Sequence, residues 1–378
     1  MVATLANWRL QPFNRWSFGH IDELLACKAI ARGQPRPLIT GSPVDLSDVK
    51  VAWQGATHSV ASLLDVTYSD SLLVLRDGMI VCERYDNGTA DGRHILFSVS
   101  KSVTGALAGV LVDKGQLDPQ APVTEYVPEV AGSAYGDCTV RHVLDMSVAV
   151  RFVEDYLDPL GDFARYRAAT AWNPPDPKFG GEDLHGFIAT LPKGDREHGS
   201  RFHYVSPNSD LLGWILERAG GEPLYALASR LLWQPMGAES DALITIDNAG
   251  SPRSAGGICT TLRDLARFGE LMRCYGQADG QQIIPRSWVE DILHNGDPEA
   301  WQRGSSASLF PHGRYRSKWY VPGDVPGVMY ALGIHGQWIY IDPNSAMVAV
   351  KFSSQPLPSD DNPDRLNLAI FRALAAYL

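Results

Sequence analysis

The chain has 378 residues, 45% of them hydrophobic, and its 33 basic and 43 acidic side chains give a net charge of -10. This length allows a large core in one domain or two, and the acidic balance without a basic run argues against a nucleic-acid partner. No apolar run approaches the ~20 residues that span a bilayer, and the start, MVATLANWRLQPFNRW, lacks the basic and apolar regions of a signal peptide. We therefore expect a cytoplasmic monomer or homodimer that acts on a small molecule, with no nucleic-acid or membrane partner.

Cysteine and histidine patterns give no indication of a metal or cofactor site. No Cys-x-x-Cys pair occurs, and the five scattered cysteines are Cys27, Cys82, Cys138, Cys259 and Cys274. The chain contains no His-Glu-x-x-His, no His-x-His and no glycine-rich phosphate loop before a helix. His198 and His203 are five residues apart, a spacing that does not place both on one helix face. We therefore expect neither a metal nor a cofactor.

The first half of the chain contains a hairpin pattern, a long helical pattern and then a change of composition. Residues 71–85, SLLVLRDGMIVCERY, hold two apolar runs joined at Asp77-Gly78, which predicts a β-hairpin. A helix is predicted from about Ser98 to Lys114, because apolar residues recur at helical spacing and Gly115 follows. These apolar residues are Val103, Ala106, Leu107, Val110 and Leu111. Residues 121–240 are punctuated by Pro and Gly between short helical patterns, which predicts a helical insertion.

The second half returns to strand and helix patterns of ordinary length. Residues 260–272, TTLRDLARFGELM, predict a helix capped by Thr260 or Thr261. Residues 336–352, GQWIYIDPNSAMVAVKF, predict two strands around a turn at 342–344, and RLNLAIFRALAAYL closes the chain as a helix. Strands near both ends predict an α/β domain built from residues 1–120 and 241–378, interrupted by an α domain over residues 121–240.

A serine and a lysine lie three residues apart at the start of the first predicted helix, in the run Ser98-Val99-Ser100-Lys101. Residues i and i+3 share a helix face, so the Ser98 hydroxyl and the Lys101 amine can meet. A hydroxyl becomes a good nucleophile when an adjacent base removes its proton. At a helix N-terminus, unpaired backbone N–H groups also stabilise a developing oxyanion. The run is therefore a candidate for nucleophilic catalysis, although it also fits a helix cap with a solvated lysine.

Other serine-hydrolase signals are weaker or missing. A second Ser-x-x-Lys, from Ser47 to Lys50, follows the turn-like segment GSPVDL and is expected to lie in a loop. The chain contains no Gly-x-Ser-x-Gly, which argues against the nucleophile elbow of the α/β-hydrolases. Ser98 is therefore the preferred nucleophile.

Ser98-x-x-Lys101, the helix that follows it and the run KGQLDPQAPVTEYVPE resemble the penicillin-recognising, β-lactamase-related serine hydrolases. Within this group, the chain is most similar to the 6-aminohexanoate-dimer (nylon oligomer) hydrolases. The shared runs span nearly the whole chain and include NRWSF at Asn14, SVSKS at Ser98, PVTEYVPE at Pro122, EDYLDP at Glu154 and GIHGQ at Gly333. The resemblance implies acyl transfer to serine and an α/β (α+β) fold, a β-lactamase-like sandwich with a central antiparallel sheet flanked by helices and an inserted all-α domain.

The resemblance also implies roles for the catalytic residues. Ser98 is the nucleophile, Lys101 is its proton partner, and Tyr204 shuttles the proton between the serine and the leaving group. The backbone N–H groups of Ser98 and Ile334 are the oxyanion donors. A free lysine titrates near ~10.4, and burial lowers the pKa by at most ~3–5 units. Because Lys101 and Tyr204 titrate as a coupled pair, which of them is the base stays open. Tyr204 also fits a core aromatic residue.

Substrate-binding residues follow from the same resemblance, and they are Tyr156, Trp172, Arg167, Ala255 and His335. Tyr156 matches a tyrosine that touches the scissile amide, and Trp172 matches one wall of the cleft, although both also fit ordinary packing. Arg167 stands where the nylon-oligomer hydrolases have an acid that holds the substrate ammonium, and Ala255 stands where they have an asparagine. An ammonium ~4 Å from a cleft-facing Arg167 is repelled by roughly 4 kcal/mol at an effective dielectric of ~20.

We therefore expect a serine hydrolase, a carboxylesterase or amidase, that cleaves small carboxylic esters and short linear amides through an acyl-enzyme on Ser98. Esters are favoured because an alcohol leaving group demands less protonation than an amine. The enzymatic alternatives are a 6-aminohexanoate-dimer amidase, a D-aminopeptidase and a weak β-lactam-binding enzyme, the last disfavoured because the Lys-Thr-Gly triplet is absent. The alternative of another class is a non-catalytic ligand-binding module on a hydrolase fold.

Overall fold

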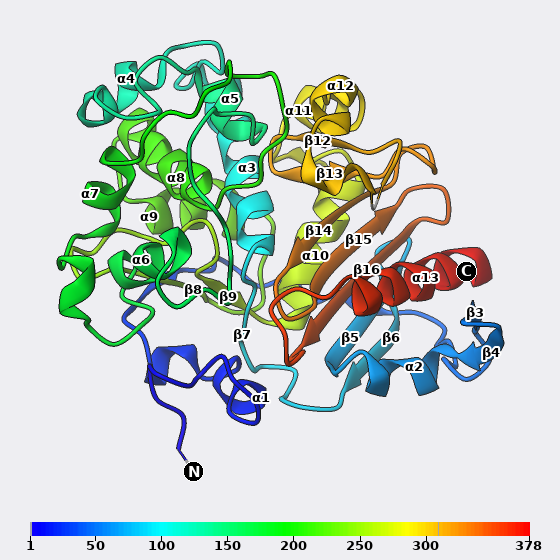
Figure 1. Cartoon of the computed structure of the whole chain (residues 1–378). Helices are drawn as coiled ribbons and strands as arrows, with labels where there is room; N and C mark the ends of the chain where they lie inside the picture. Colours follow the sequence, from blue (N-terminus) through cyan, green and yellow to red (C-terminus); the bar gives the residue numbers. More distant parts are fainter. Residues whose placement is uncertain (1, 309) are drawn as a thin grey trace.

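The computed structural model describes residues 2–308 and 310–378, and it contains one large sheet to which both ends of the chain contribute (Figure 1). The strands follow the order β12-β13-β14-β15-β16-β5-β6-β2, and every named pair is antiparallel except β2 with β6. Their bounds are β12 (Arg314–Arg316), β13 (Trp319–Val321), β14 (Met329–Gly333), β15 (Gln337–Asp342), β16 (Met347–Ser353), β5 (Ser69–Arg76), β6 (Met79–Tyr85) and β2 (Ile39–Thr40). The pairing of β16 with β5 joins the C-terminal strands to the N-terminal ones.

Smaller sheets complete the strand inventory. One has the order β1-β8-β9-β7, with β1 (Cys27–Ile30), β8 (Ala242–Thr245), β9 (Ile258–Thr260) and β7 (His94–Ile95). The other two are the pairs β3 (Lys50–Trp53) with β4 (Ala56–Ser59), and β10 (Gln277–Ala278) with β11 (Gln281–Gln282). The four-stranded sheet again combines N-terminal strands with strands from beyond residue 240.

The predicted hairpin is confirmed as β5 and β6. Asp77 and Gly78 between them have φ angles of 49° and 75°, the left-handed backbone that a tight two-residue hairpin turn requires. The second predicted strand pair is confirmed as β15 and β16, joined by a turn that ends at Ala346 (φ 53°).

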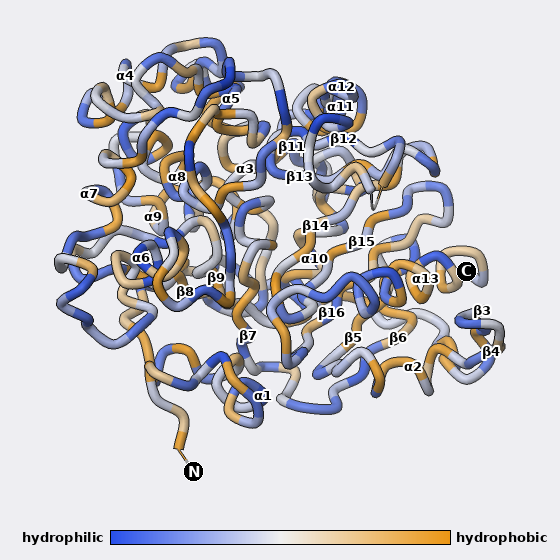
Figure 2. Tube along the Cα trace, viewed as in Figure 1, coloured by the Kyte–Doolittle hydropathy of each residue, from blue (hydrophilic) through white to orange (hydrophobic). Residues whose placement is uncertain are grey.

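Helices cover both faces of the large sheet, because its central strands are apolar on both sides. Leu73 and Leu75 of β5 belong to the cluster that contains α10 (Leu262–Arg273), whereas Leu72 and Val74 belong to the cluster that contains α13 (Asp361–Tyr377) and α2 (Val60–Val66). Figure 2 shows the hydrophobic residues concentrated along the central strands and the helices that cover them. The fold class predicted from the sequence, an antiparallel sheet flanked by helices, is confirmed.

Most of the remaining helices lie between β7 and β8. Within residues 96–241, all of which the structure describes, no strand is longer than an isolated bridge. The helices there are α3 (Val99–Asp113), α4 (Val123–Tyr126), η2 (Pro128–Val130), α5 (Val140–Leu144), α6 (Asp162–Ala169), η3 (Pro177–Phe179), α7 (Leu184–Ala189), α8 (Pro207–Gly220), α9 (Leu224–Ala228) and η4 (Ser229–Trp233). The others are α1 (Asn14–Ser17), η1 (Ile21–Glu23), α11 (Arg286–His294), α12 (Pro298–Gln302) and η5 (Ser305–Ser308). Among the described residues, no helix combines the length and the apolar character that crossing a bilayer requires.

α3 lies between the helical part and the large sheet. It packs against α8 and α9 on one side and against β14 and β15 on the other. The predicted helix is buried all round, from Val99 to Leu111. Gly105 and Gly109 permit this, because a Cβ at either position would overlap the Ser317 carbonyl or the Trp288 ring. The division into domains at residues 120 and 240 stays a prediction.

The starts of two helices show what the sequence patterns predict and what they miss. α10 begins as predicted, with the Thr261 side chain accepting a hydrogen bond from the Asp264 N–H. α13 begins at Asp361, four residues before the apolar pattern starts at Arg365, because Asp360 caps a polar first turn.

Replacing Gly105 by alanine is expected to destabilise the protein, because the new Cβ would overlap a backbone atom that must then shift. Overpacking of this kind lowers the free energy of unfolding by about 1–3 kcal/mol. Gly132→Ala is a matched control, since a Cβ at Gly132 meets only open space. Urea unfolding measures both variants, and equal unfolding free energies would show that α3 does not need this close approach.

Candidate active site

Ser98 is presented to the surface at the N-terminal end of α3. β7 leads into Leu96, Phe97 adopts a left-handed backbone with φ 44°, and Ser98 is the N-cap of the helix. From His94 to Leu111, Ser98 is the one residue that is not buried. A non-glycine residue with positive φ is strained, and such strain persists where the surrounding packing fixes it. The strained turn and the buried helix therefore direct a single accessible hydroxyl outward.

Lys101 lies one helical turn further on and contacts that hydroxyl. Its Nζ donates hydrogen bonds to Ser98 Oγ (2.8 Å) and to the Ala255 carbonyl oxygen (2.7 Å). The side chain is 2% exposed, and this burial lowers the pKa of Lys101 to about 8, even though the carboxylates of Glu154 and Asp210 act in the opposite direction. A substantial fraction of the amine is therefore neutral near pH 8, as a general base must be.

The Ala255 carbonyl is itself held in place. Its own N–H donates to Asp210 Oδ1 on α8 (2.7 Å), and the buried Asp210 carboxylate also accepts from the Tyr166 hydroxyl. The contact with Lys101 uses the backbone of residue 255, so it does not depend on the side chain there. The absence of an asparagine at this position therefore leaves the lysine contact intact.

Tyr204 is the neighbour of Lys101 on the side of the helical part. It lies just before α8 in the chain, and the Lys101 ammonium is 5.0 Å from the centroid of its ring. The ring also packs near Phe202 and the cluster around Trp301, as a core aromatic residue does. Burial raises the pKa of the Tyr204 hydroxyl well above its usual value, so this hydroxyl keeps its proton at neutral pH.

The end of β14 lies beside the start of α3. A Cβ on Gly333 would be 3.2 Å from the Ser98 backbone nitrogen and 2.5 Å from the Leu96 carbonyl oxygen, so only glycine allows this approach. Ile334 follows at the cavity wall. His335 has φ 61°, its Nδ1 contacts the Gln355 carbonyl (2.7 Å), and burial lowers its pKa to about 4. His335 is therefore a neutral, fixed part of the wall at neutral pH.

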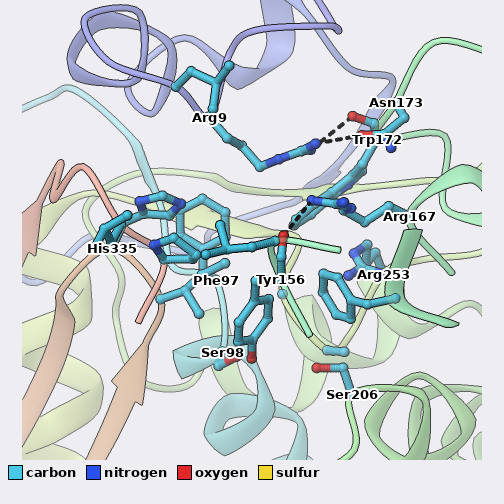
Figure 3. Close-up of a pocket in the computed structure, with 18 of the residues that line it drawn as sticks. Arg9, Phe97, Ser98, Tyr156, Arg167, Trp172, Asn173, Ser206, Arg253 and His335 are labelled. Carbon is cyan, nitrogen blue, oxygen red and sulfur yellow. Dashed lines mark hydrogen bonds between the residues drawn. The ribbon is translucent and has the colours of Figure 1, made fainter. Parts of the chain in front are cut away.

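A cavity of about 520 Å³ opens over Ser98 (Figure 3). It brings together most of the residues singled out in the sequence, namely Ser98, Lys101, Ile334, Tyr156, Trp172, Arg167, Ala255 and His335. Arg167, whose orientation the sequence left open, lines the cavity. The second Ser-x-x-Lys lies elsewhere, in a turn where Lys50 Nζ donates to the Ser47 backbone carbonyl (2.5 Å) and not to its hydroxyl.

Tyr156 and Ser206 line the cavity, and both hydrogen-bond to one carboxylate that does not line it. Glu154 accepts hydrogen bonds from the Tyr156 hydroxyl (2.7 Å) and from the N–H and hydroxyl of Ser206 (2.5 and 2.6 Å). Glu154 thereby fixes the tyrosine. Trp172 is 3% exposed, and its indole N–H donates to Thr245 Oγ1 (3.1 Å), so it is both a packing residue and a cavity wall.

Sequence patterns did not single out Arg9 and Arg253, which line the cavity, or Glu154, which holds two residues of its wall. Arg9 donates to the Trp172 carbonyl (3.0 Å) and to Asn173 Oδ1 (2.5 Å), which are more than 160 residues away in the chain. Arg253 stands two residues before Ala255 and stacks on the Trp172 ring at 4.1 Å. For Glu154, the run EDYLDP offered a signal, because it places an acid two residues before Tyr156.

The chain is similar to known proteins along most of its length. The chain is 39% identical over 359 residues to the 6-aminohexanoate-dimer hydrolase of Paenarthrobacter ureafaciens, covering 94% of this chain and 89% of that protein. The solved structure described as "Putative 6-aminohexanoate-dimer hydrolase from Bacillus anthracis" superposes with a TM-score of 0.90 at 27% identity, covering 99% and 96% of the two chains. A family VIII carboxylesterase shares the fold, with a TM-score of 0.60 at 16% identity and coverage of 83% and 95%.

The family model described as Beta-lactamase matches residues 60–373, which include Ser98, Lys101, Tyr204 and Ile334. The resemblance drawn from the sequence motifs is therefore confirmed. Because the match spans most of the chain, this protein belongs to the beta-lactamase family, whose members are serine hydrolases.

Proposed function

We propose that this protein hydrolyses small carboxylic esters and short linear amides through an acyl-enzyme on Ser98. The contact of 2.8 Å between the Ser98 hydroxyl and the buried Lys101 amine is the observation on which the proposal chiefly rests. Nucleophilic catalysis requires a hydroxyl within hydrogen-bond reach of a base, and the base must itself be held in place. The Ala255 carbonyl supplies that support from the other side of Nζ.

The first half of the reaction is the transfer of an acyl group to Ser98. A carbonyl oxygen can only accept, so the Ala255 carbonyl keeps one N–H of the Lys101 amine whether the amine is charged or neutral. When the ammonium loses the proton that it donates to Ser98 Oγ, the nitrogen lone pair takes the place of that N–H and can accept the Ser98 proton. As Ser98 Oγ attacks the substrate carbonyl carbon, its proton passes to Lys101 Nζ. The carbonyl oxygen becomes an oxyanion, which the backbone N–H groups of Ser98 and Ile334 stabilise at the junction of α3 and β14.

The second half expels the leaving group and frees the serine. We assign the next proton transfer to Tyr204, because its hydroxyl keeps its proton at neutral pH and its ring lies beside Lys101. In this step the hydroxyl donates its proton to the departing oxygen or nitrogen and recovers one from Lys101. Water then attacks the acyl carbon, and the proton travels the opposite way to regenerate Ser98. Alcohols leave with less protonation than amines, so esters should be the easier substrates.

Linear amides remain part of the proposal because of Tyr156. This residue lines the cavity over Ser98, and the relative that is 39% identical is named for a linear amide, the 6-aminohexanoate dimer. The oxygen of Tyr156 is already hydrogen-bonded to Glu154, so its orientation is set before a substrate binds. A ligand-binding module would need no activated serine, and the Ser98–Lys101 contact therefore favours an enzyme.

Ser98 should be the residue that an active-site phosphonate labels, because it combines an accessible hydroxyl with a neighbouring buried amine. Mass spectrometry of peptides from the labelled protein identifies the site. Ser98→Ala should lower ester turnover by about three orders of magnitude or more, because it removes the covalent route. Ser47→Ala is the matched control and should change neither readout. Labelling of Ser47 or Ser206, or an active Ser98→Ala variant, would refute the proposal.

Tyr204→Phe should slow amide hydrolysis more than ester hydrolysis. The substitution keeps the ring against Lys101 and removes the proton donor, a loss worth about 10²–10⁴-fold where the leaving group must be protonated. Steady-state kinetics on an ester and an amide with the same acyl group provide the comparison. Equal losses on both would contradict the relay role, and wild-type rates on both would leave Tyr204 with packing alone.

A further inference from the structure

Three guanidinium groups line the cavity above Ser98. They come from distant parts of the chain, Arg9 near the N-terminus, Arg167 on α6 and Arg253 just before β9. In Figure 3 the Arg9 guanidinium lies across the cavity from Ser98, with Arg167 between Arg9 and Arg253. Among the described residues, no aspartate or glutamate lines this cavity, and Glu154 touches it only through its hydrogen bonds with Tyr156 and Ser206. The charged side chains that line the cavity are therefore all basic.

The three arginines differ in how far the protein neutralises them. Arg253 is 3% exposed, lies over the rings of Tyr166 (4.5 Å) and Trp172 (4.1 Å), and forms an ion pair with Asp210 (3.4 Å). Arg9 donates only to neutral oxygens, those of Trp172 and Asn173, and Arg167 donates to the Tyr156 carbonyl (3.3 Å). The Arg253 charge is therefore balanced within the protein, whereas those of Arg9 and Arg167 are not.

Burial and like charge disfavour the protonated forms of Arg9 and Arg167. Burial and the neighbouring charges of Arg167 and Arg253 lower the pKa of Arg9 to about 9, and burial and Arg253 lower the pKa of Arg167. No carboxylate of the described residues acts against these shifts. The buried Nε of Arg167 also lacks a hydrogen-bond partner among the described residues. Guanidinium N–H groups are therefore available to an incoming acceptor.

We propose that Arg9 and Arg167 form a carboxylate-binding subsite, so that the enzyme prefers esters or amides carrying a carboxylate at the end remote from the scissile bond. Guanidinium and carboxylate match in charge and in planar, bidentate geometry. The anion would also relieve the repulsion between the two cations, which a neutral or ammonium-bearing substrate cannot do. The aromatic walls at Phe163 and Trp172 suit an apolar chain between the two ends of such a substrate.

This inference rests on the proposed hydrolysis, and paired substrates test it. Mono-4-nitrophenyl adipate and 4-nitrophenyl hexanoate share an acyl chain and differ in its terminal carboxylate. A second pair, 4-carboxyphenyl hexanoate and its methyl ester, carries the difference on the leaving group. The wild type should have the higher kcat/KM for the anionic member of one pair, and that pair identifies the end of the substrate that the subsite holds.

Arg9→Gln and Arg167→Gln should each lower the ratio of anionic to neutral kcat/KM by about 10- to 100-fold in that pair, because each removes a charge-assisted hydrogen bond. Using a ratio cancels any general loss of catalysis. Arg32→Gln, at an exposed position outside the cavity, makes the same charge change and should leave the ratio as in the wild type. A wild type that prefers the neutral member of both pairs, or a ratio unchanged in both cavity variants, would overturn the proposal.

A binding experiment on the inactive Ser98→Ala variant distinguishes failure of the subsite from failure of the proposed hydrolysis. Calorimetry should show that the Ser98→Ala protein binds monomethyl adipate and that added salt weakens this binding. Adding Arg167→Gln to Ser98→Ala should abolish the binding. If no ester is turned over but this binding is observed, the subsite holds and the proposed activity is wrong. If Ser98→Ala does not bind the anion at all, the subsite is wrong, whatever the wild type hydrolyses.

Discussion

Burial of the Lys101 amine next to Ser98 is the constraint on which the rest of the site depends. An ordinary lysine is protonated at neutral pH and cannot take a proton from a serine. Removing water from the ammonium destabilises the charged form, while Ala255 keeps the amine pointed at the hydroxyl. The proposed carboxylate subsite shows the same principle elsewhere in the cavity, where the partly buried guanidiniums of Arg9 and Arg167 have no acidic partner.

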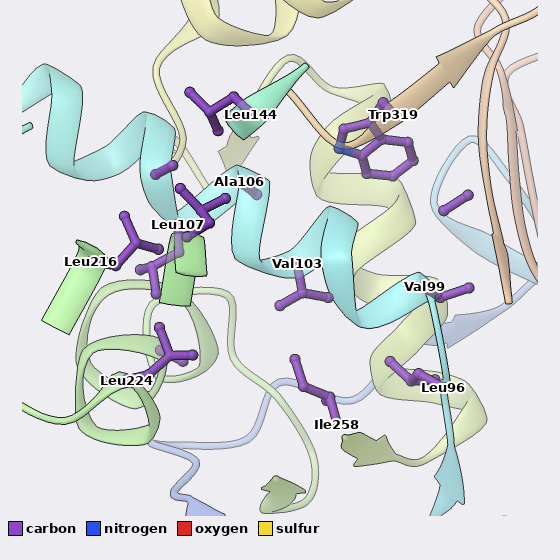
Figure 4. Close-up of a cluster of buried hydrophobic side chains, with 14 of the residues drawn as sticks. Leu96, Val99, Val103, Ala106, Leu107, Leu144, Leu216, Leu224, Ile258 and Trp319 are labelled. Atoms are coloured by element: carbon purple, nitrogen blue, oxygen red, sulfur yellow. The ribbon is translucent and has the colours of Figure 1, made fainter. Parts of the chain in front are cut away.

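The Lys101 amine is buried because other helices and strands pack around α3 on all sides. Figure 4 shows its apolar side chains meeting Leu216 and Leu224 of the helical part, Ile258 of β9 and Trp319 of β13. The helix is enclosed on all sides, so its first turn can hold a lysine away from water while Ser98 stays accessible. The glycines that admit Ser317 and Trp288 are thus part of how the site is built, although they lie far from the reacting atoms.

Sequence patterns predicted the features that depend only on residues close together in the chain. The spacing of Ser98 and Lys101 follows from the helix, and Asp77-Gly78 specifies its own turn. Residues joined only by the fold could not be found in this way. Arg9 enters the site through Trp172 and Asn173, and no periodicity links positions so far apart. Tyr204 needed the family resemblance, because a tyrosine in a loop carries no catalytic signature of its own. Whether Arg167 faces the cleft also depends on the fold, and in the structure it lines the cavity.

The pH dependence of kcat/KM for an uncharged ester tests the central claim most directly, because it reports the free enzyme's essential base. Burial lowers the pKa of Lys101 to about 8. The rate should therefore be low at acidic pH, rise as the amine loses its proton, and level off above a midpoint near pH 8. A rate that keeps rising toward ~10.4, the value of a solvated lysine, or that is flat across this range, would contradict the account.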